Sequence, residues 1–484
     1  MLNFLVPGQE REPREPRQTR RDRREATREA WPSSLWRDTN RRFHFPTPST
    51  DIDCDVLVVG AGFSGLWTAH HLHRISPGIR IVIVDAMQPG YGGSGRNGGW
   101  CSALYPLPPD RMFDVLGAGS ASMTRRALER TVASIGGLIE SSGVEADWAH
   151  NGSLTVARNE TQVARLKDQA RDWGSIGATD VRWLDAEELR GRIRVNGALG
   201  ALHDPHCAVL NPYRLLDHLV QDAVEHGVRI FGGTRVTRVG RGFAETRSDT
   251  GLAFVTAGKT VIATEAYAPR LEGSERDVVP VYSCIIATEP IPAQTWAEIG
   301  WDGREALAES THVVSYAQRT GDGRLLLGGR GAPYGFGSDV HSSRDTHRRV
   351  EADLRGHITR LFPTLTNVRV SHSWGGPVAV PRDMQPSVNI DDETGAIHLG
   401  GYAGDGVALS NLCARIAAHL TTGTQDECLA LPVNGHSPVR WELEPFRWMG
   451  INTAVRVARG LDAAESSGRE PGPVLRAAAR VLPV

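Results

Sequence analysis

The chain has 484 residues, of which 40% are hydrophobic and 23% charged, and its 54 basic and 56 acidic residues give a net charge of −2. This length corresponds to roughly two to four domains with a large buried core and excludes a disordered chain. The near-neutral charge argues against nucleic acid as the main partner, because phosphate binding needs a basic surplus. No run approaches 18 apolar residues, so no membrane-spanning helix is expected.

The cysteines point to a reducing compartment. They are scattered without any CxxC pair, which predicts neither a zinc site nor any other metal site, and we expect a cytoplasmic protein. The six are Cys54, Cys101, Cys207, Cys284, Cys413 and Cys428.

The first fifty residues differ in composition from the rest. Residues 10–30 are an Arg/Glu/Pro run with almost no apolar side chain, so they cannot bury enough surface to offset their chain entropy. We expect residues 1–50 to form a disordered, arm-like extension. Trp31 and Trp36 are predicted to mark where this arm docks onto the body.

A dinucleotide-binding pattern follows. Val56–Val59 reads as a buried strand, Leu66, Ala69 and Leu72 continue at helical spacing, and Ile81–Val84 reads as a second strand ending in Asp85. Between strand and helix stands a GxGxxG motif, which lets backbone and a helix N-terminus approach a pyrophosphate. An acid after the second strand can accept hydrogen bonds from ribose. The three glycines are Gly60, Gly62 and Gly65.

Three histidines lie on the helix of this unit, namely His70, His71 and His73. We expect them to face solvent rather than to bind a metal, because no acid or cysteine accompanies them in the sequence.

The run GYGGSGRNGG at 90–99 is too glycine-rich for the interior of a helix or strand, and it offers backbone N–H groups to an extended ligand. With GFSGLWTAHHL before it and WCS after it, the chain resembles the D-amino-acid-oxidase-like FAD-dependent oxidoreductases. Within the glycine/sarcosine oxidase group it looks most like the γ-glutamylputrescine oxidase branch. The resemblance implies FAD as the cofactor, with this run beside the pyrophosphate and ribityl chain.

The resemblance recurs twice more. Asn211 and Pro212 are suited to start a helix, and the family's backbone near Val236 meets the adenine. Val261–Ala263 reads as a strand with a turn at Thr264, followed by Glu265 where the family usually has Asn. GGYAGDG then precedes a helix predicted from Val407 to Leu420, whose positive end the family places at the pyrimidine edge of the flavin.

Together these motifs imply one set of cofactor contacts. The expected residues are Gly60, Gly62, Phe63, Ser64, Gly65, Asp85, Ala86, Gly93, Ser94, Arg96, Asn97, Gly98, Gly99, Val236, Ala263, Thr264, Arg382, Gly401, Gly404, Asp405, Gly406 and Val407.

The expected fold class is α/β: a discontinuous Rossmann-like FAD-binding domain with an α+β substrate domain built on an antiparallel sheet. The FAD-binding domain is expected at 52–112, 203–276 and 372–428. The substrate domain is expected at 113–202, which reads as helices, and at 277–371, which reads as strands. A closing helical segment is expected at 429–484, with a last helix after the EPGP turn near 470.

The function that the resemblance implies is oxidation of a C–N bond in an amine or amino acid by hydride transfer to flavin N5. The imine formed hydrolyses to an aldehyde or keto acid, and the electrons pass to O₂ or another acceptor. The candidate catalytic residues are Arg330, Tyr402, Asp405 and His372. The only two lysines, Lys167 and Lys259, do not fit the role of the O₂-activating lysine of the sarcosine-oxidase branch.

Three alternatives stay open. A flavin-dependent monooxygenase of the N-hydroxylase type would need a second nucleotide motif for NAD(P)H, and the sequence has only the one at 60–65. An NAD-dependent dehydrogenase would leave the RNGG run and the GGYAGDG junction without a role. A non-catalytic flavoprotein subunit is the third. The substrate and the oligomeric state are not encoded in any motif.

Overall fold

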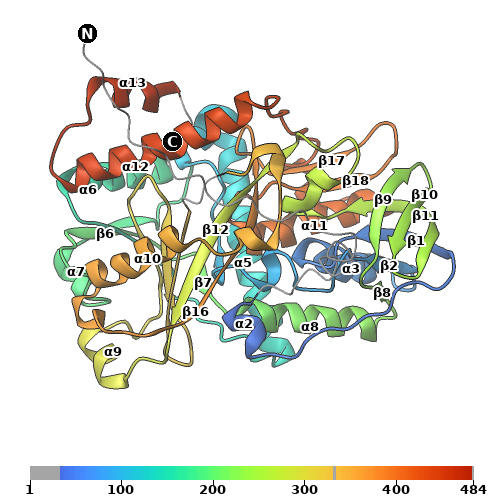
Figure 1. Cartoon of the computed structure of the whole chain (residues 1–484), viewed down its shortest axis with the longest axis horizontal. Helices are drawn as coiled ribbons and strands as arrows, with labels where there is room; N and C mark the ends of the chain where they lie inside the picture. The colour runs from blue at the N-terminus through green and yellow to red at the C-terminus, as the bar shows by residue number, and fades with distance from the viewer. Residues whose placement is uncertain (1–32, 331–333, 482–484) are drawn as a thin grey trace, which may run out of the picture.

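A computed structural model describes residues 33–330 and 334–481 of the chain. Two eight-stranded sheets organise it, one on the right and one on the left of Figure 1. Residues 1–32, which hold most of the expected arm and Trp31, lie outside the described residues.

The first sheet has the strand order β17-β18-β11-β1-β2-β8, extended by β10 and β9 beside β11. Its centre is parallel: β1 pairs with β11 on one side and β2 on the other. The strands are β1 (Ile52–Val59), β2 (Ile81–Val84), β8 (Arg229–Phe231), β9 (Arg235–Gly240), β10 (Phe243–Ser248), β11 (Gly251–Ile262), β17 (Ser387–Ile390) and β18 (Ile397–Gly400).

Helices cover one face of this sheet and a β-hairpin covers the other. Val56 and Val58 of β1 join the core formed with the helices α3 (Phe63–Ile75), α8 (Pro212–Glu225) and α11 (Gly406–Thr422). Leu57 and Val59 point the other way, into a core shared with β9 and β10. Burial on both faces explains why Val56–Val59 of β1 and the whole of β2 are continuous apolar runs rather than alternating ones.

The second sheet has the order β16-β12-β15-β14-β13-β4-β6-β5. All its pairs are antiparallel except the parallel pair of β13 with β4. The strands are β4 (Ser153–Ala157), β5 (Arg182–Asp185), β6 (Gly200–Asp204), β12 (Val278–Thr288), β13 (Ala306–Glu309), β14 (Ser315–Arg319), β15 (Leu325–Arg330) and β16 (Val370–Pro381). A small separate pair joins β3 (Trp100–Ser102) to β7 (Cys207–Val209).

Residues 113–202 are not helical throughout, which corrects the expectation for this segment. The strands β4 and β5 lie within it and β6 begins in it. Of these, β4 pairs with β13 and so joins the three strands to those of 277–371 in the second sheet. These strands were missed because each is only four or five residues long. The expected boundaries near 112, 203 and 371 also fall inside elements, namely α4 (Pro109–Leu116), β6 and β16.

Helices flank the second sheet on its two faces. α6 (Glu160–Ser175) buries Leu166 and Trp173 with Leu202 of β6, whereas α10 (Arg348–Leu361) packs in a separate core with Leu154 of β4. Four further helices are α4, α5 (Ala118–Ser142), α7 (Ala186–Arg190) and α9 (Ala293–Ile299).

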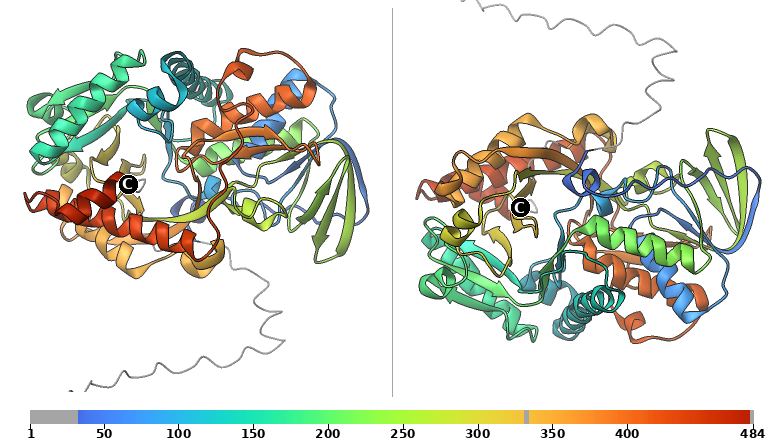
Figure 2. Two further views of the ribbon diagram at one scale, coloured as in Figure 1. Left: turned by 90° about the horizontal axis from the view of Figure 1, so that it is seen from above. Right: turned by 90° about the horizontal axis from the view of Figure 1, so that it is seen from below.

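The C-terminal segment is helical, as expected. α12 (Phe446–Ser466) and α13 (Pro473–Val481) lie beside the second sheet, drawn in red in Figures 1 and 2. At the other end of the described chain, α2 (Leu35–Asp38) is buried against the body through Leu35 and Trp36. In the described residues, no helix is both long and apolar enough to cross a bilayer. All six cysteines are buried and free.

Candidate active site

One cavity of about 940 Å³ is lined both by residues of the first sheet and its helices and by residues of the second sheet and its helices. This is near the upper end of the size range of ligand sites. One end follows the turn after β1, and the other is bordered by α6, β13 and the loop after it. The cavity therefore connects the dinucleotide motif with the second sheet.

The turn after β1 has the geometry that the glycine motif predicts. Gly60 has φ +110° and an added Cβ would lie 2.6 Å from the carbonyl oxygen of Ala263. A Cβ on Gly65 would lie 1.9 Å from the carbonyl oxygen of Gly60, so this glycine serves helix packing and does not line the cavity. Gly62, Phe63 and Ser64 line it at the start of α3.

Asp85 lies on the cavity wall at the end of β2, next to Ala86. Its carboxylate accepts hydrogen bonds from the backbone N–H groups of Ala61 and Met87, both at 2.7 Å. Burial raises its pKa. The acid thus ties β2 to the glycine turn, and each of its oxygens keeps a second lone pair for a ribose hydroxyl.

The loop of residues 93–99 contributes Gly93, Ser94, Arg96, Asn97 and Gly98 to the cavity. The Ser94 hydroxyl accepts the N–H of Phe63 at 2.8 Å and so caps the start of α3. Gly99 lies behind the lining, where a Cβ would meet the carbonyl oxygen of Leu210 at 2.2 Å.

Arg96 is held by protein groups although it lines the cavity. Its guanidinium donates to Asp345 at 2.9 Å, to the carbonyl oxygen of Gly375 at 3.0 Å and to the Tyr267 hydroxyl at 2.9 Å. The side chain is buried. Arg96 therefore joins the loop to β16 and to the segments that follow β11 and β15.

The end of β11 adds Ala263, Thr264 and Glu265 to the lining, and β9 adds Val236. Among the described residues the buried Thr264 hydroxyl has no hydrogen-bond partner. Such an orphaned polar group beside a glycine cradle fits a polar ligand that supplies the missing bond.

Glu265, the departure from the family's usual Asn, is a buried acid at φ +47°. Its two oxygens accept the N–H groups of Tyr402 at 3.0 Å and Ala379 at 3.1 Å. Burial raises its pKa to about 7, although these backbone N–H groups favour the charged form. Glu265 thus ties the loop before α11 to β16.

That loop brings Tyr402, Gly404, Asp405, Gly406 and Val407 to the cavity, whereas Gly401 lies just outside it. The Tyr402 hydroxyl is 2.8 Å from Ser64 Oγ, and burial holds the pKa of the phenol well above its usual range. Asp405 is the residue before the first turn of α11.

Two further candidates, His372 and Arg382, do not line the cavity, and the side chain of a third, Arg330, is not described. His372 lies in β16, with its Nδ1 2.8 Å from Ser371 Oγ. Arg382 pairs with Glu442 at 3.0 Å and stacks on Trp441. The backbone of Arg330 ends β15 opposite Ser283, which does line the cavity, but its side chain is outside the described part of the structure.

Several lining residues were not anticipated from the sequence. They come from elements of the second sheet and its helices, and no local motif marks them. They include Arg165, Gln169, Trp173, Glu309, His312 and Tyr316.

The expectation for the three histidines is wrong in two respects, because α8 and its C-cap bring an acid and a further histidine to them, and one of the three faces the interior. His70 Nδ1 lies 2.8 Å from Asp222, and the His73 and His226 rings lie with centroids 3.9 Å apart and planes tilted by 41°. His71 faces the interior, and burial lowers its pKa to about 3.

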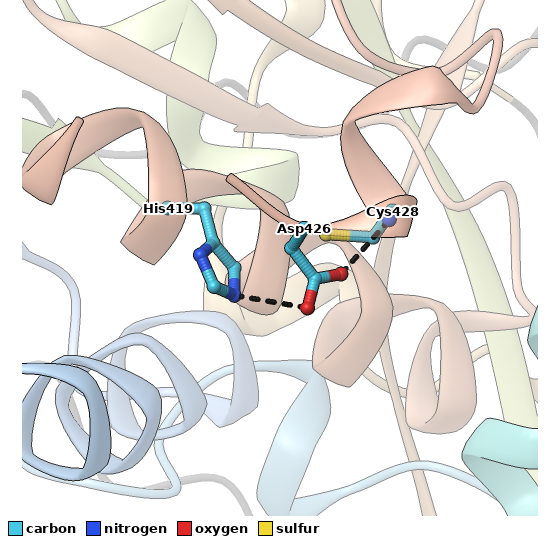
Figure 3. A group of neighbouring side chains, drawn as sticks. All are labelled: His419, Asp426 and Cys428. Carbon is cyan, nitrogen blue, oxygen red and sulfur yellow. Dashed lines mark hydrogen bonds and ion pairs between the residues drawn. The ribbon is translucent and has the colours of Figure 1, made fainter. Parts of the chain in front are cut away.

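Two other groups of metal-ligand side chains occur in the described chain. In the first, Figure 3 shows Asp426 between His419 and Cys428. Arg415 donates to Asp426 at 2.6 Å, and burial raises the pKa of the Cys428 thiol, which disfavours the thiolate that metals bind. This group is explained as a capping and ion-pair network. The second group is Glu129, Asp180 and His206, where Arg125 already contacts Glu129 at 2.7 Å.

The residues around the glycine turn suit a dinucleotide: free space along a glycine cradle, a helix N-terminus, an acid after β2 and an unpartnered hydroxyl on the wall. The model of the DAO family, described as FAD dependent oxidoreductase, matches residues 55–420. The chain belongs to this family. Its cofactor is therefore FAD, and the cradle just described is where these residues would hold it.

Individual relatives agree. The chain is 28% identical over 417 residues to the γ-glutamylputrescine oxidoreductase of Escherichia coli, covering 85% of this chain and 94% of that protein. Its fold is similar to glycine oxidase from Geobacillus kaustophilus, with a TM-score of 0.66 at 20% identity, covering 80% of this chain and 99% of that one. It is also similar to L-proline dehydrogenase from P. horikoshii, with a TM-score of 0.65 at 18% identity, covering 79% and 96% of the two chains.

Proposed function

We propose that this FAD-dependent oxidoreductase oxidises the C–N bond of an amine or amino acid. A hydride leaves the carbon that bears the nitrogen and passes to the flavin. The resulting imine is hydrolysed to an aldehyde or keto acid with release of an amine or ammonia. The two electrons pass on to O₂ or another acceptor.

The observation that carries this proposal is the shared cavity. The cradle that fits FAD opens, without a separating wall of residues, onto a space lined by β4, β12, β13 and α6. A substrate bound there lies beside the cofactor, which is what oxidation by hydride transfer requires. The similarity to γ-glutamylputrescine oxidoreductase along most of both chains supports an amine as the donor.

The chain's own residues would bind and orient the substrate. When bound, FAD supplies the hydride acceptor. Asp405 on the cavity wall is placed to attract a substrate ammonium, and Tyr402 presents a neutral hydroxyl beside it. Trp100, Trp173 and Tyr316 line the same cavity with apolar surface, which helps to keep water from the reacting carbon.

The electron acceptor is not indicated by the fold, because an oxidase and a dehydrogenase are both among the similar structures. Neither lysine lines the cavity: Lys167 lies over the Trp183 ring, and Lys259 is in β11.

The test is an anaerobic titration of the purified holoenzyme with a panel of amines and amino acids. We expect one substrate class to bleach the flavin absorbance, and the speed of recovery in air then separates an oxidase from a dehydrogenase. Bleaching by NAD(P)H but by no amine would instead indicate the monooxygenase. A flavoprotein that no donor reduces would indicate a non-catalytic subunit.

A further inference from the structure

The end of the cavity remote from the glycine cradle has a polar wall of its own. Arg165 and Gln169 of α6 line it together with Ser310, Thr311 and His312, which follow β13. In Figure 1, α6 lies on the left and β1 on the right of the molecule. A substrate bound between this wall and the cradle would turn one of its ends toward the wall.

Helix α12 holds this wall in place from behind. Glu465 Oε1 accepts a hydrogen bond from Arg165 and lies 3.0 Å from His312 Nε2. Asp462 accepts the backbone N–H groups of His312 at 2.7 Å and Val313 at 2.9 Å. α12 begins at residue 446, beyond the residues 55–420 that the family model matches.

Glu465 acts from inside the protein rather than from the cavity. Its side chain is 8% exposed, it does not line the cavity, and its Oε2 atom is buried without a partner among the described residues. A carboxylate so placed can fix cationic groups but cannot itself reach a substrate.

The groups that do reach the cavity include hydrogen-bond donors. The Arg165 side chain is 34% exposed; its Nη1 donates to Ser310 and its Nη2 contacts Glu465 and His312, which leaves its Nε–H outside these contacts. The acids nearby have basic partners of their own. Glu309 pairs with His357 at 2.9 Å, and Asp204 pairs with the buried Arg125 at 2.7 Å. The wall thus presents net donor character toward an anion.

We propose that Arg165, supported by His312 and held by Glu465, binds a carboxylate at the end of the amine substrate remote from the reacting carbon. The substrate class would then be ω-amino carboxylates rather than simple alkyl amines. The Nε–H of a guanidinium can give a carboxylate a charge-assisted hydrogen bond. This assignment rests on the proposed amine oxidation, since it names the far end of the same substrate.

The test compares 5-aminopentanoate with pentylamine, which has the same chain length and no carboxylate, in the holoenzyme. We expect kcat/KM to favour 5-aminopentanoate in the wild type. Arg165→Gln should lower kcat/KM for 5-aminopentanoate about 10- to 100-fold, mainly through KM, and should change that for pentylamine by no more than about twofold. Arg165→Lys keeps the charge without the planar fork and should restore part of the loss.

Arg171→Gln is the matched control, because Arg171 lies on the same helix but is exposed and pairs only with Asp168. Arg171→Gln should change kcat/KM for neither substrate. An equal loss for both amines in Arg165→Gln, or a wild type that does not distinguish them, would overturn the assignment.

Pentanoate carries the carboxylate but no amine. It therefore distinguishes failure of the carboxylate site from failure of the proposed amine oxidation. Pentanoate should raise the melting temperature of the wild type and not that of Arg165→Gln, even if no amine bleaches the flavin. If pentanoate stabilises both proteins equally or neither of them, the carboxylate site is refuted.

Discussion

The indole N–H of Trp36 donates to the carbonyl oxygen of Asn97 at 2.8 Å, and the indole of Trp374 donates to the neighbouring carbonyl of Arg96 at 2.9 Å. The two rings pack edge to face, with centroids 6.4 Å apart. A residue before the family region and one from β16 therefore hold the loop that lines the cofactor cradle. The predicted docking of Trp36 onto the body is confirmed.

Trp36→Phe keeps much of the buried ring but leaves the Asn97 carbonyl without its donor. We expect a loss of about 1–3 kcal/mol in the free energy of unfolding, because a buried polar group is left unpaired. The affinity for FAD should fall as well. Chemical denaturation and FAD titration measure the two effects. Trp448→Phe in α12, where the side chain is 38% exposed, is the control and should leave both unchanged.

Gly65→Ala should abolish FAD binding. The added methyl would lie 1.9 Å from the carbonyl oxygen of Gly60, which is backbone and cannot rotate away, so α3 must separate from β1. The matched control is Gly137→Ala in α5, where nothing lies within 4 Å of the new methyl. That change should stabilise the protein by up to about 1 kcal/mol through helix propensity. Flavin absorbance per mole of protein and the melting temperature report on both variants, and a yellow Gly65→Ala protein of normal stability would refute this role.

Glu265 should make stability depend on pH. Burial raises its pKa from 4.5 to about 7, so between these values the folded state binds more protons than the unfolded state. The stabilisation is complete below pH 4.5 and is lost as the pH rises through about 7. Relative to Glu265→Gln, the wild type should therefore lose up to about 3 kcal/mol between pH 4.5 and 8. Unfolding measured across this range for both proteins checks the sign, and a constant difference would contradict it.

Much of this site lies in contiguous motifs and was predictable. The unit β1-α3-β2, the cap of α8 by Asn211, and α11 each depend on neighbours within a few residues, and the structure confirms them. The second sheet was only partly predictable, because β4 pairs with β13 across about 150 residues of chain and no local periodicity records that pairing. For the same reason the sequence did not predict the contact between Arg165 and Glu465.

A buried ion pair between α5 and β6 offers a test of that long-range architecture. Arg125 of α5 contacts Asp204 of β6 through two N–H groups, at 2.7 and 2.9 Å, and both side chains are buried. Arg125→Met leaves Asp204 buried and unpaired on the cavity wall, which should cost about 3–5 kcal/mol. Arg130→Met on the same helix breaks only an exposed pair with Glu427 and should cost less than about 1 kcal/mol. Equal stabilities of the two variants would show that the pair is not formed.

Oxidation at a C–N bond is the central claim, and a single-turnover experiment tests it most directly. The holoenzyme is mixed without oxygen with the best amine of the panel and with the same amine deuterated at the carbon that bears the nitrogen. The account predicts slower bleaching of the flavin with the deuterated amine, and one carbonyl product with one released amine or ammonia per flavin reduced. Bleaching without carbonyl product, or at the same rate for both amines with binding and mixing shown to be faster, would contradict hydride removal from that carbon.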